Sequence, residues 1–221
     1  RLSASDTYDP TAPGGAFLSG APAGQERVAA SAYEAGLRVG VAKGLDVIAR
    51  TGRSFRFANV DEIYEFSPAF TAQFQFLRPQ SARTHELGVA VGARAPWLKA
   101  SVFRMDVTDE IHLDPFSTGV GNRNMPPLRR DGLELEARHA LAKGVELTGA
   151  YTYTRAKFTD GDLNGVAIAG KSVPLVPRHK IDLSADWQIT PATRLRAFAQ
   201  SVSEQVMEND EGNTFDRRIP G

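Results

Sequence analysis

The sequence alternates apolar and polar side chains over long stretches, and this pattern limits the chain to β structure. In residues 180–190, apolar side chains occupy Ile181, Leu183, Ala185, Trp187 and Ile189, with Asp182, Ser184, Asp186 and Gln188 between them. A helix would scatter these apolar residues, because positions two apart are separated by about 200° around its axis. A strand places all of them on one face. Residues 132–141 and 145–154 follow the same alternation.

The alternating segments predict eight strands in a repeating arrangement. They span residues 31–42, 44–54, 83–93, 97–112, 129–141, 144–158, 178–190 and 193–206. Tight turns with Gly or Pro join the members of each pair, at residues 42–44, 93–96, 142–144 and 190–193. The other connections are long and polar, at residues 55–82, 113–128 and 159–177, with further polar segments at 1–30 and 207–221. Short turns at one end and long loops at the other are typical of an outer-membrane barrel.

Composition excludes several classes of protein. The chain has 26 Lys and Arg against 26 Asp and Glu, so no net field favours nucleic acid. It has no Cys, which removes disulfides and thiolate chemistry. No run approaches the roughly 18 apolar residues of a spanning helix. Neither a G-x-S-x-G elbow nor a Gly-rich phosphate loop occurs, so the sequence predicts no catalytic residue, no enzyme and no cofactor.

Alternation alone leaves a membrane barrel and a soluble β-sandwich open, because both have one apolar and one polar face. Strands of roughly 11–15 residues favour the barrel, since soluble strands usually have about 5–6. Trp97 and Trp187 lie beside short turns, whereas Tyr151 and Tyr153 lie farther along their strand. That spacing would place aromatic side chains at both membrane interfaces.

Five motifs, in order along the chain, carry a resemblance to a known family. They are RSFRFANVDEIY at 53–64, LRPQ with THELG at 77–88, ASVFRMDVTDEI at 100–111, RDGLELE at 130–136 and VPLVPRHK at 173–180. In type, order and spacing they resemble the barrel of TonB-dependent outer-membrane receptors.

The resemblance implies an all-β fold, an antiparallel transmembrane barrel segment with short periplasmic turns and long extracellular loops. Such barrels have roughly 22 strands, so we expect residues 1–221 to form part of a receptor barrel domain, without its plug domain or final strand. The implied function is active import of a scarce ligand across the bacterial outer membrane, and the expected cargo is a ferric siderophore. The implied partners are this ligand, outer-membrane lipid and the TonB energising complex, which acts through the plug. No nucleic acid is expected.

Loop aromatic and Arg side chains are the candidate ligand contacts, because they suit flat, anionic iron chelates by stacking and charge. They are Tyr8, Phe17, Tyr64, Phe116, Arg123, Arg129, Phe158 and Arg178. Asp160 and Asp162 begin an Asp-Gly-Asp segment that resembles half of an EF-hand loop, and they are a candidate loop ion site. An ordinary Asp/Asn/Gly turn is the alternative.

Other functions stay open at this point. A passive porin-like barrel, an adhesin barrel or a soluble β-sandwich binding module would show similar alternation. Within the import hypothesis, cobalamin, haem or a glycan are alternative cargoes. Burial of Ile181, Leu183 and Trp187 against a second protein layer would contradict the membrane interpretation.

Overall fold

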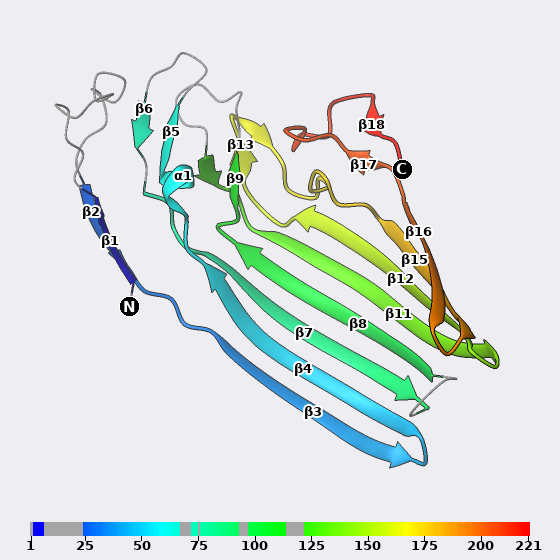
Figure 1. Ribbon diagram of the computed structural model, residues 1–221. Coiled ribbons are helices and arrows are strands. Elements are labelled where there is room, and N and C mark those ends of the chain that lie inside the picture. The colour runs from blue at the N-terminus through cyan, green and yellow to red at the C-terminus, as the bar shows by residue number, and fades with distance from the viewer. Residues whose placement is uncertain (1, 7–23, 67–71, 75, 93–96, 114–121) are drawn as a thin grey trace.

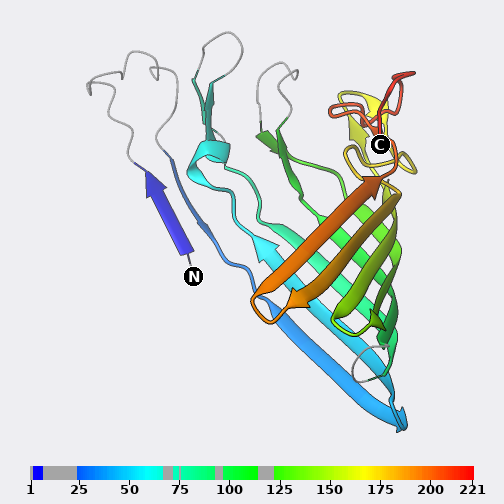
Figure 2. The same ribbon diagram turned by 45° about the vertical axis from the view of Figure 1, so that its right-hand side comes forward.

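The computed structural model describes residues 2–6, 24–66, 72–74, 76–92, 97–113 and 122–221. Its main element is one antiparallel sheet of eight strands in the order β16-β15-β12-β11-β8-β7-β4-β3. Each strand therefore pairs with the main-sheet strand next to it in the sequence. The sheet is strongly curved, with β15 and β16 curling forward from the plane of β3 and β4 (Figures 1 and 2).

The sheet strands have the following bounds: β3 Tyr33–Ala42, β4 Leu45–Arg56, β7 Gln80–Val91, β8 Trp97–Thr108, β11 Leu128–Ala142, β12 Val145–Phe158, β15 His179–Thr190 and β16 Thr193–Val202. These confirm the eight predicted strands. The predicted strand 97–112 is shorter, because Asp109 adopts a left-handed φ of 56° and ends the extended run.

The long loops carry secondary structure that the sequence did not predict. Two-stranded ribbons form from β1 Leu2–Asp6 with β2 Gly24–Val28, and from β5 Tyr64–Phe66 with β6 Ala72–Phe74. Others are β9 Ile111–Leu113 with β10 Asn122–Asn124, β13 Asp162–Leu163 with β14 Val166–Ala167, and β17 Gln205–Val206 with β18 Arg218–Ile219. The helix α1 spans Val60–Ile63. None of the helices in the described ranges is long and apolar enough to cross a membrane.

Two hairpin turns share the tripeptide Ala-Lys-Gly and the same backbone geometry. Gly44 and Gly144 have φ values of 73° and 75°, which glycine adopts without the steric cost of a Cβ. In both turns the register shifts just before the turn, between residues 40 and 42 and between residues 140 and 142. The Gly44 carbonyl oxygen accepts a hydrogen bond of 2.7 Å from the N–H of Gly92, just after β7, and that of Gly144 accepts one of 2.7 Å from Gln188 in β15. These turns confirm the predictions at 42–44 and 142–144, whereas the turn at 93–96 lies outside the described residues.

The two faces of the sheet differ as the alternation predicts. On one face, called the apolar face below, Ile181, Leu183 and Trp187 are 42%, 54% and 47% exposed. No second sheet covers them among the described residues, so the β-sandwich alternative does not hold. The opposite, polar face carries Glu134 on β11 and Asp182 and Asp186 on β15, with β12 between these two strands.

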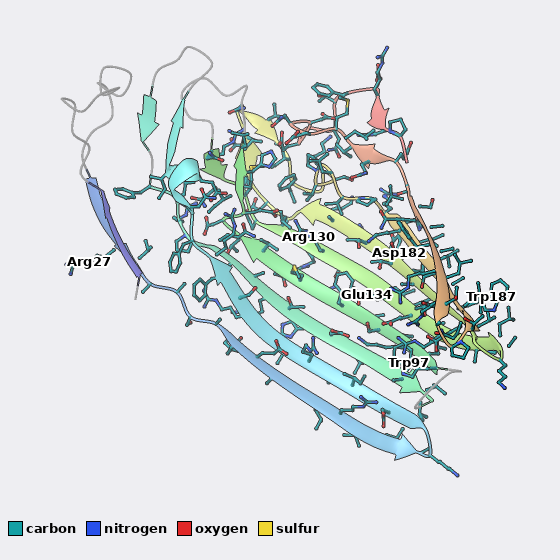
Figure 3. The ribbon with its side chains drawn as sticks, viewed as in Figure 1. Arg27, Trp97, Arg130, Glu134, Asp182 and Trp187 are labelled. Carbon is teal, nitrogen blue, oxygen red and sulfur yellow. The ribbon has the colours of Figure 1, made fainter. Side chains whose placement is uncertain are left out.

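The register corrects the expectation for one tryptophan. Both Trp97 and Trp187 lie near the turns (Figure 3). Trp187 pairs with Val145 and Leu195 on the apolar face. Trp97 pairs instead with Arg138, whose row belongs to the polar face. A period of two sends neighbouring side chains to opposite faces, so Leu98 and not Trp97 joins the apolar face.

The largest buried cluster lies at the loop end of the sheet. Val107, Leu128 and Phe158 form one cross-strand row on the polar face, and each is 2% exposed. Met125, Ile168 and Val173 come from the loops and pack on this row. The loops after β9 and β12 therefore fold inward over the polar face, where they bury apolar area away from water.

Candidate functional site at the loop end of the sheet

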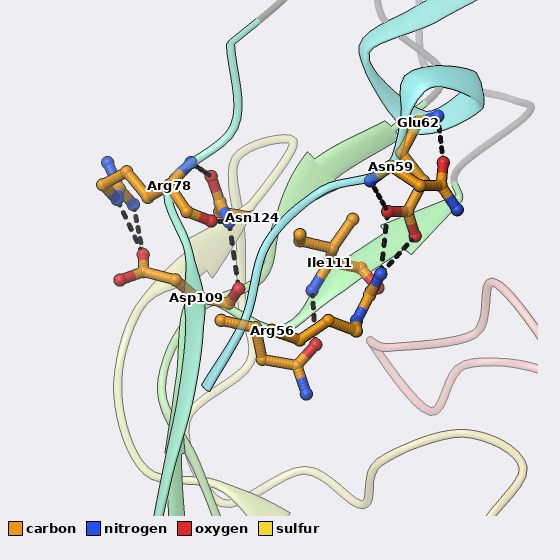
Figure 4. A network of polar contacts seen from close by, with 8 residues as sticks. Arg56, Asn59, Glu62, Arg78, Asp109, Ile111 and Asn124 are labelled. Carbon is orange, nitrogen blue, oxygen red and sulfur yellow. Dashed lines mark hydrogen bonds and ion pairs between the residues drawn. The ribbon is translucent and has the colours of Figure 1, made fainter. Parts of the chain in front are cut away.

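A network of polar contacts fixes α1 to the end of β4 (Figure 4). Arg56 donates two hydrogen bonds to the Glu62 carboxylate, at 2.8 and 2.7 Å. Asn59 and Glu62 bond reciprocally to each other's backbone N–H, at 2.8 and 2.9 Å. This is a capping box, which satisfies N–H groups at the start of a helix. Glu62 therefore both begins the helix and anchors it to the end of β4.

Asn124 joins three loop segments in the same region (Figure 4). Its Oδ1 accepts from the N–H of Arg78 at 2.8 Å, and its Nδ2 donates to the carbonyls of Arg78 and Asp109, each at 2.9 Å. The Arg78 Nε donates to the Asp109 carboxylate at 2.7 Å. The loop before β7, the turn after β8 and β10 are therefore held as one unit.

A cavity of about 260 Å³ lies beneath the loops on the polar face. Apolar side chains, including Met125, Leu128 and Phe158, line part of it. Arg130 also lines it and pairs with Glu110 at 3.0 Å. His112 Nε2 and Glu211 Oε1 lie 3.5 Å apart and, like Arg130 Nε, have no hydrogen-bond partner among the described residues. The cavity thus combines apolar walls with buried polar atoms that have no hydrogen-bond partner among the described residues.

A second cavity of about 440 Å³ lies where β12 extends beyond its partner β15. Its charged lining is mostly basic, with Arg155, Lys157, Arg178 and Arg218 against Glu204. The backbone N–H of Arg178 is held by Ser203 Oγ at 3.0 Å. Such a concentration of cations favours an anionic group.

The polar face below the loops is charged but largely compensated. Cross-strand and neighbouring pairs include Arg38–Asp46, Arg50–Glu34, Lys99–Glu86, Arg138–Glu146, Lys180–Asp182 and both Arg194 and Arg196 with Asp186. Within the described ranges, Glu134 and Glu136 have no ion-pair partner. Mixed charges of this kind suit a surface that faces water or another polar domain.

The structure separates the candidate ligand residues. Arg178 lines the larger cavity and Phe158 lines the smaller one, where it belongs to the buried cluster. Arg123 donates to Asn164 at 3.0 Å. Arg129 lies on the apolar face and pairs with Asp106 at 2.7 Å. Tyr64 begins β5, and its side chain lies outside the description, as do Tyr8, Phe17 and Phe116.

The candidate ion site at Asp160 and Asp162 remains a prediction. Asp160 Oδ1 accepts from the N–H of Gly161 at 2.7 Å. That contact is an ordinary feature of Asp in turns. Over the described ranges, no three His, Asp or Glu side chains form a group that could hold a metal ion.

Sequence reasoning missed the residues that define the cavities. Glu211 lies about 100 positions after Glu110 and His112 in the sequence. These residues meet only because β9 and the loop after β17 cover the same strands. Arg155 and Lys157 were visible only as part of a strand. Their alternation on β12 was the one available signal that both side chains share a face.

A curved antiparallel sheet with an uncovered apolar face, short turns at one end and folded loops at the other defines a wall of an outer-membrane β-barrel. The model of the family described as TonB dependent receptor-like, beta-barrel matches residues 3–221. The chain belongs to this family, which confirms the resemblance seen in its motifs. It is therefore an outer-membrane protein of a family of transport receptors.

Three relatives illustrate the similarity. The ferrichrome outer membrane transporter and phage receptor of Escherichia coli K12 is 28% identical over 151 residues, which cover 62% of this chain and 19% of that protein. The ferric preacinetobactin receptor of Acinetobacter baumannii has a TM-score of 0.60 at 20% identity, covering 90% of this chain and 28% of that one. The ferric yersiniabactin uptake receptor of Yersinia pestis has a TM-score of 0.60 at 22% identity, covering 83% and 27%. The chain thus spans a fifth to about a quarter of the length of these relatives.

Proposed function

We propose that this chain is part of the barrel of a receptor that imports a ferric siderophore through the TonB system. The observation that carries the proposal is family membership over residues 3–221, taken with a ferrichrome transporter as a relative. A plug domain, expected of the family, would couple the barrel to TonB. Porin-like and adhesin functions are not favoured, because the family is one of transport receptors.

The larger cavity at the loop end supports an anionic, oxygen-rich cargo. The larger cavity is lined by four cations, which attract a negatively charged chelate. The smaller one sets a few polar side chains beside apolar walls, a combination common in small-molecule sites, but Arg130 is paired there with Glu110 and adds no net positive charge. Of the ligand residues expected from the sequence, Arg178 at the larger cavity is the one we propose as a direct contact. The other seven, Phe158 among them, remain predictions.

Uptake of radioactive iron tests this function directly. A strain lacking the complete receptor gene is supplied with hydroxamate, catecholate and carboxylate ferric chelates, with and without a proton-motive-force inhibitor. We expect the deletion strain to lose energy-dependent uptake of one chelate class and to regain this uptake when the gene is restored. Equal uptake of every chelate by the deletion and parent strains contradicts iron import.

A variant separates cargo binding from barrel assembly. Arg178→Gln removes one cation from the larger cavity, and Lys43→Gln removes one at the opposite, turn end. We expect chelate affinity to fall about tenfold for Arg178→Gln, since loss of one charge-assisted contact has about this effect. Lys43→Gln should bind normally, and equal affinity of both variants would remove Arg178 from the binding site.

A further inference from the structure

The strand register gathers cations on the apolar face, two rows beyond its last apolar row. The row between them is polar and contains the ion pair of Arg104 with Asp131. Arg53 lies directly opposite Arg83, Arg83 opposite Asp106, Asp106 opposite Arg129, and Arg129 opposite Lys157. We call these five residues the cationic row. It holds four cations and one carboxylate, and Tyr33 extends it onto β3, opposite Arg53.

Most of the charge in the cationic row is uncompensated. Asp106 is engaged by Arg129 at 2.7 Å. Arg53 and Arg83 make no ion pair or side-chain hydrogen bond with any other described residue. Like charges directly opposite each other on a sheet destabilise it. An anion between Arg53 and Arg83 would remove this repulsion.

The position of the cationic row matches the edge of the membrane. Two rows closer to the turns, Leu87 and Val102 are 56% and 54% exposed on the apolar face. Arg53 follows the turn at Gly44 by about nine residues, which at about 3.3 Å per residue and a tilt of about 40° spans about 23 Å. The apolar band of outer-membrane barrels is about 25 Å tall. The cations therefore lie at the loop-side border of the hydrocarbon.

We propose that the cationic row binds the phosphate-bearing head group of a lipid in the outer leaflet, with Arg53 and Arg83 as its main ligands. Guanidinium groups suit phosphate because they donate two parallel hydrogen bonds to its oxygens. The acyl chains of the same lipid would lie against Leu87, Val102 and their neighbours. Charge above an apolar wall fits an amphipathic ligand better than a free anion. Arg53 and Arg83 line neither of the two cargo cavities, whereas Lys157, at the far end of the row, also lines the larger one. Lipid binding at Arg53 and Arg83 therefore does not depend on the transported ligand.

Lipid binding to the complete receptor tests this proposal. Wild-type protein and Arg53→Gln/Arg83→Gln are reconstituted with phosphatidylcholine and titrated with bisphosphorylated lipid A, with bound lipid counted by native mass spectrometry. The matched control is Arg38→Gln/Arg50→Gln, which removes two arginines from the polar face of β3 and β4 in the same sheet. We expect affinity to fall about 100-fold in the first variant, about tenfold per guanidinium. The control should bind like wild type.

Additional measurements test whether the lipid phosphates are the group that is bound and whether each variant is folded. Lipid A without phosphates should bind wild type as weakly as the double Gln variant binds the intact lipid. Arg53→Lys/Arg83→Lys should recover part of the affinity, and every variant should keep the electrophoretic shift of a folded barrel. Three results would each overturn the proposal. One is an equal loss of lipid affinity in the polar-face control, another is undiminished lipid binding by Arg53→Gln/Arg83→Gln, and the third is equal binding of the dephosphorylated lipid by the wild type. Displacement of the lipid by an equal concentration of inorganic phosphate would also overturn it, in favour of a free-anion site.

Discussion

The hydroxyl of Tyr151 lies 2.8 Å from Nδ1 of His179, across the pair formed by β12 and β15. The two rings are also stacked, with centroids 6.1 Å apart and an interplanar angle of 19°. Tyr153 contacts the same imidazole, at 5.4 Å between centroids. The three rings lie on the apolar face where β15 begins, so they brace the sheet at the loop side of its apolar surface.

Loss of the Tyr151 hydroxyl should weaken the barrel without disturbing its shape. We expect Tyr151→Phe to lower the free energy of unfolding by about 1 kcal/mol, the usual net value of one hydrogen bond. The measurement is urea unfolding of the complete receptor in lipid vesicles. Tyr153→Phe is the control, because the Tyr153 hydroxyl has no hydrogen bond to a described residue. Equal stability of the two variants would contradict the role given to the Tyr151–His179 contact.

Gly132 should not tolerate a side chain. A Cβ at this position would overlap the ring of its cross-strand neighbour Phe103 and the carbonyl oxygen of Tyr153. We expect Gly132→Ala to cost about 1–3 kcal/mol, as overpacking usually does. Gly36→Ala is a matched control in the same sheet, since its nearest added contact is an ordinary 3.9 Å. The measurement is the thermal unfolding midpoint of each variant, and equal midpoints would contradict the predicted overlap.

Adjacent positions on β15 should respond in opposite ways to a new charge. Leu183→Lys would place an ammonium group on the apolar face, at a cost of about 2–4 kcal/mol near the bilayer midplane. Ser184→Lys adds the same charge to the polar face, where charged side chains are already common. We expect only Leu183→Lys to reduce the folded fraction recovered in vesicles. Equal loss in both would show that the two faces do not differ in environment.

Asn124 should control the rigidity of the loop network. Asn124→Ala removes the acceptor of the Arg78 N–H and both donated bonds to loop carbonyls. We expect the amide of Arg78 to exchange with solvent about tenfold faster, since one lost hydrogen bond is worth about 1 kcal/mol or slightly more. The Glu62 amide, held separately by Asn59, is the internal reference. Unchanged exchange at Arg78 would contradict this role.

Prediction from the sequence was most successful where a periodic pattern met a simple geometric rule. Ile181, Leu183 and Trp187 recur at every second position, and only an extended backbone brings them to one face. Ala-Lys-Gly repeats at two turns, because the left-handed conformation there favours glycine. Strands, turns, the two faces and the family therefore followed from local patterns.

Contacts between distant segments were decided only by the tertiary structure. Arg53 opposes Arg83 because the register of β4 on β7 is fixed by the whole strand pair, and a shift of one residue would move each side chain to the other face. The sequence placed Trp97 at the membrane border because the pairing of Trp97 with Arg138 on the polar face could not be seen without the register. His112 and Glu211 come together because apolar loop residues bury themselves over Leu128 and Phe158. Local pattern thus determined what each strand is, whereas packing determined which side chains meet.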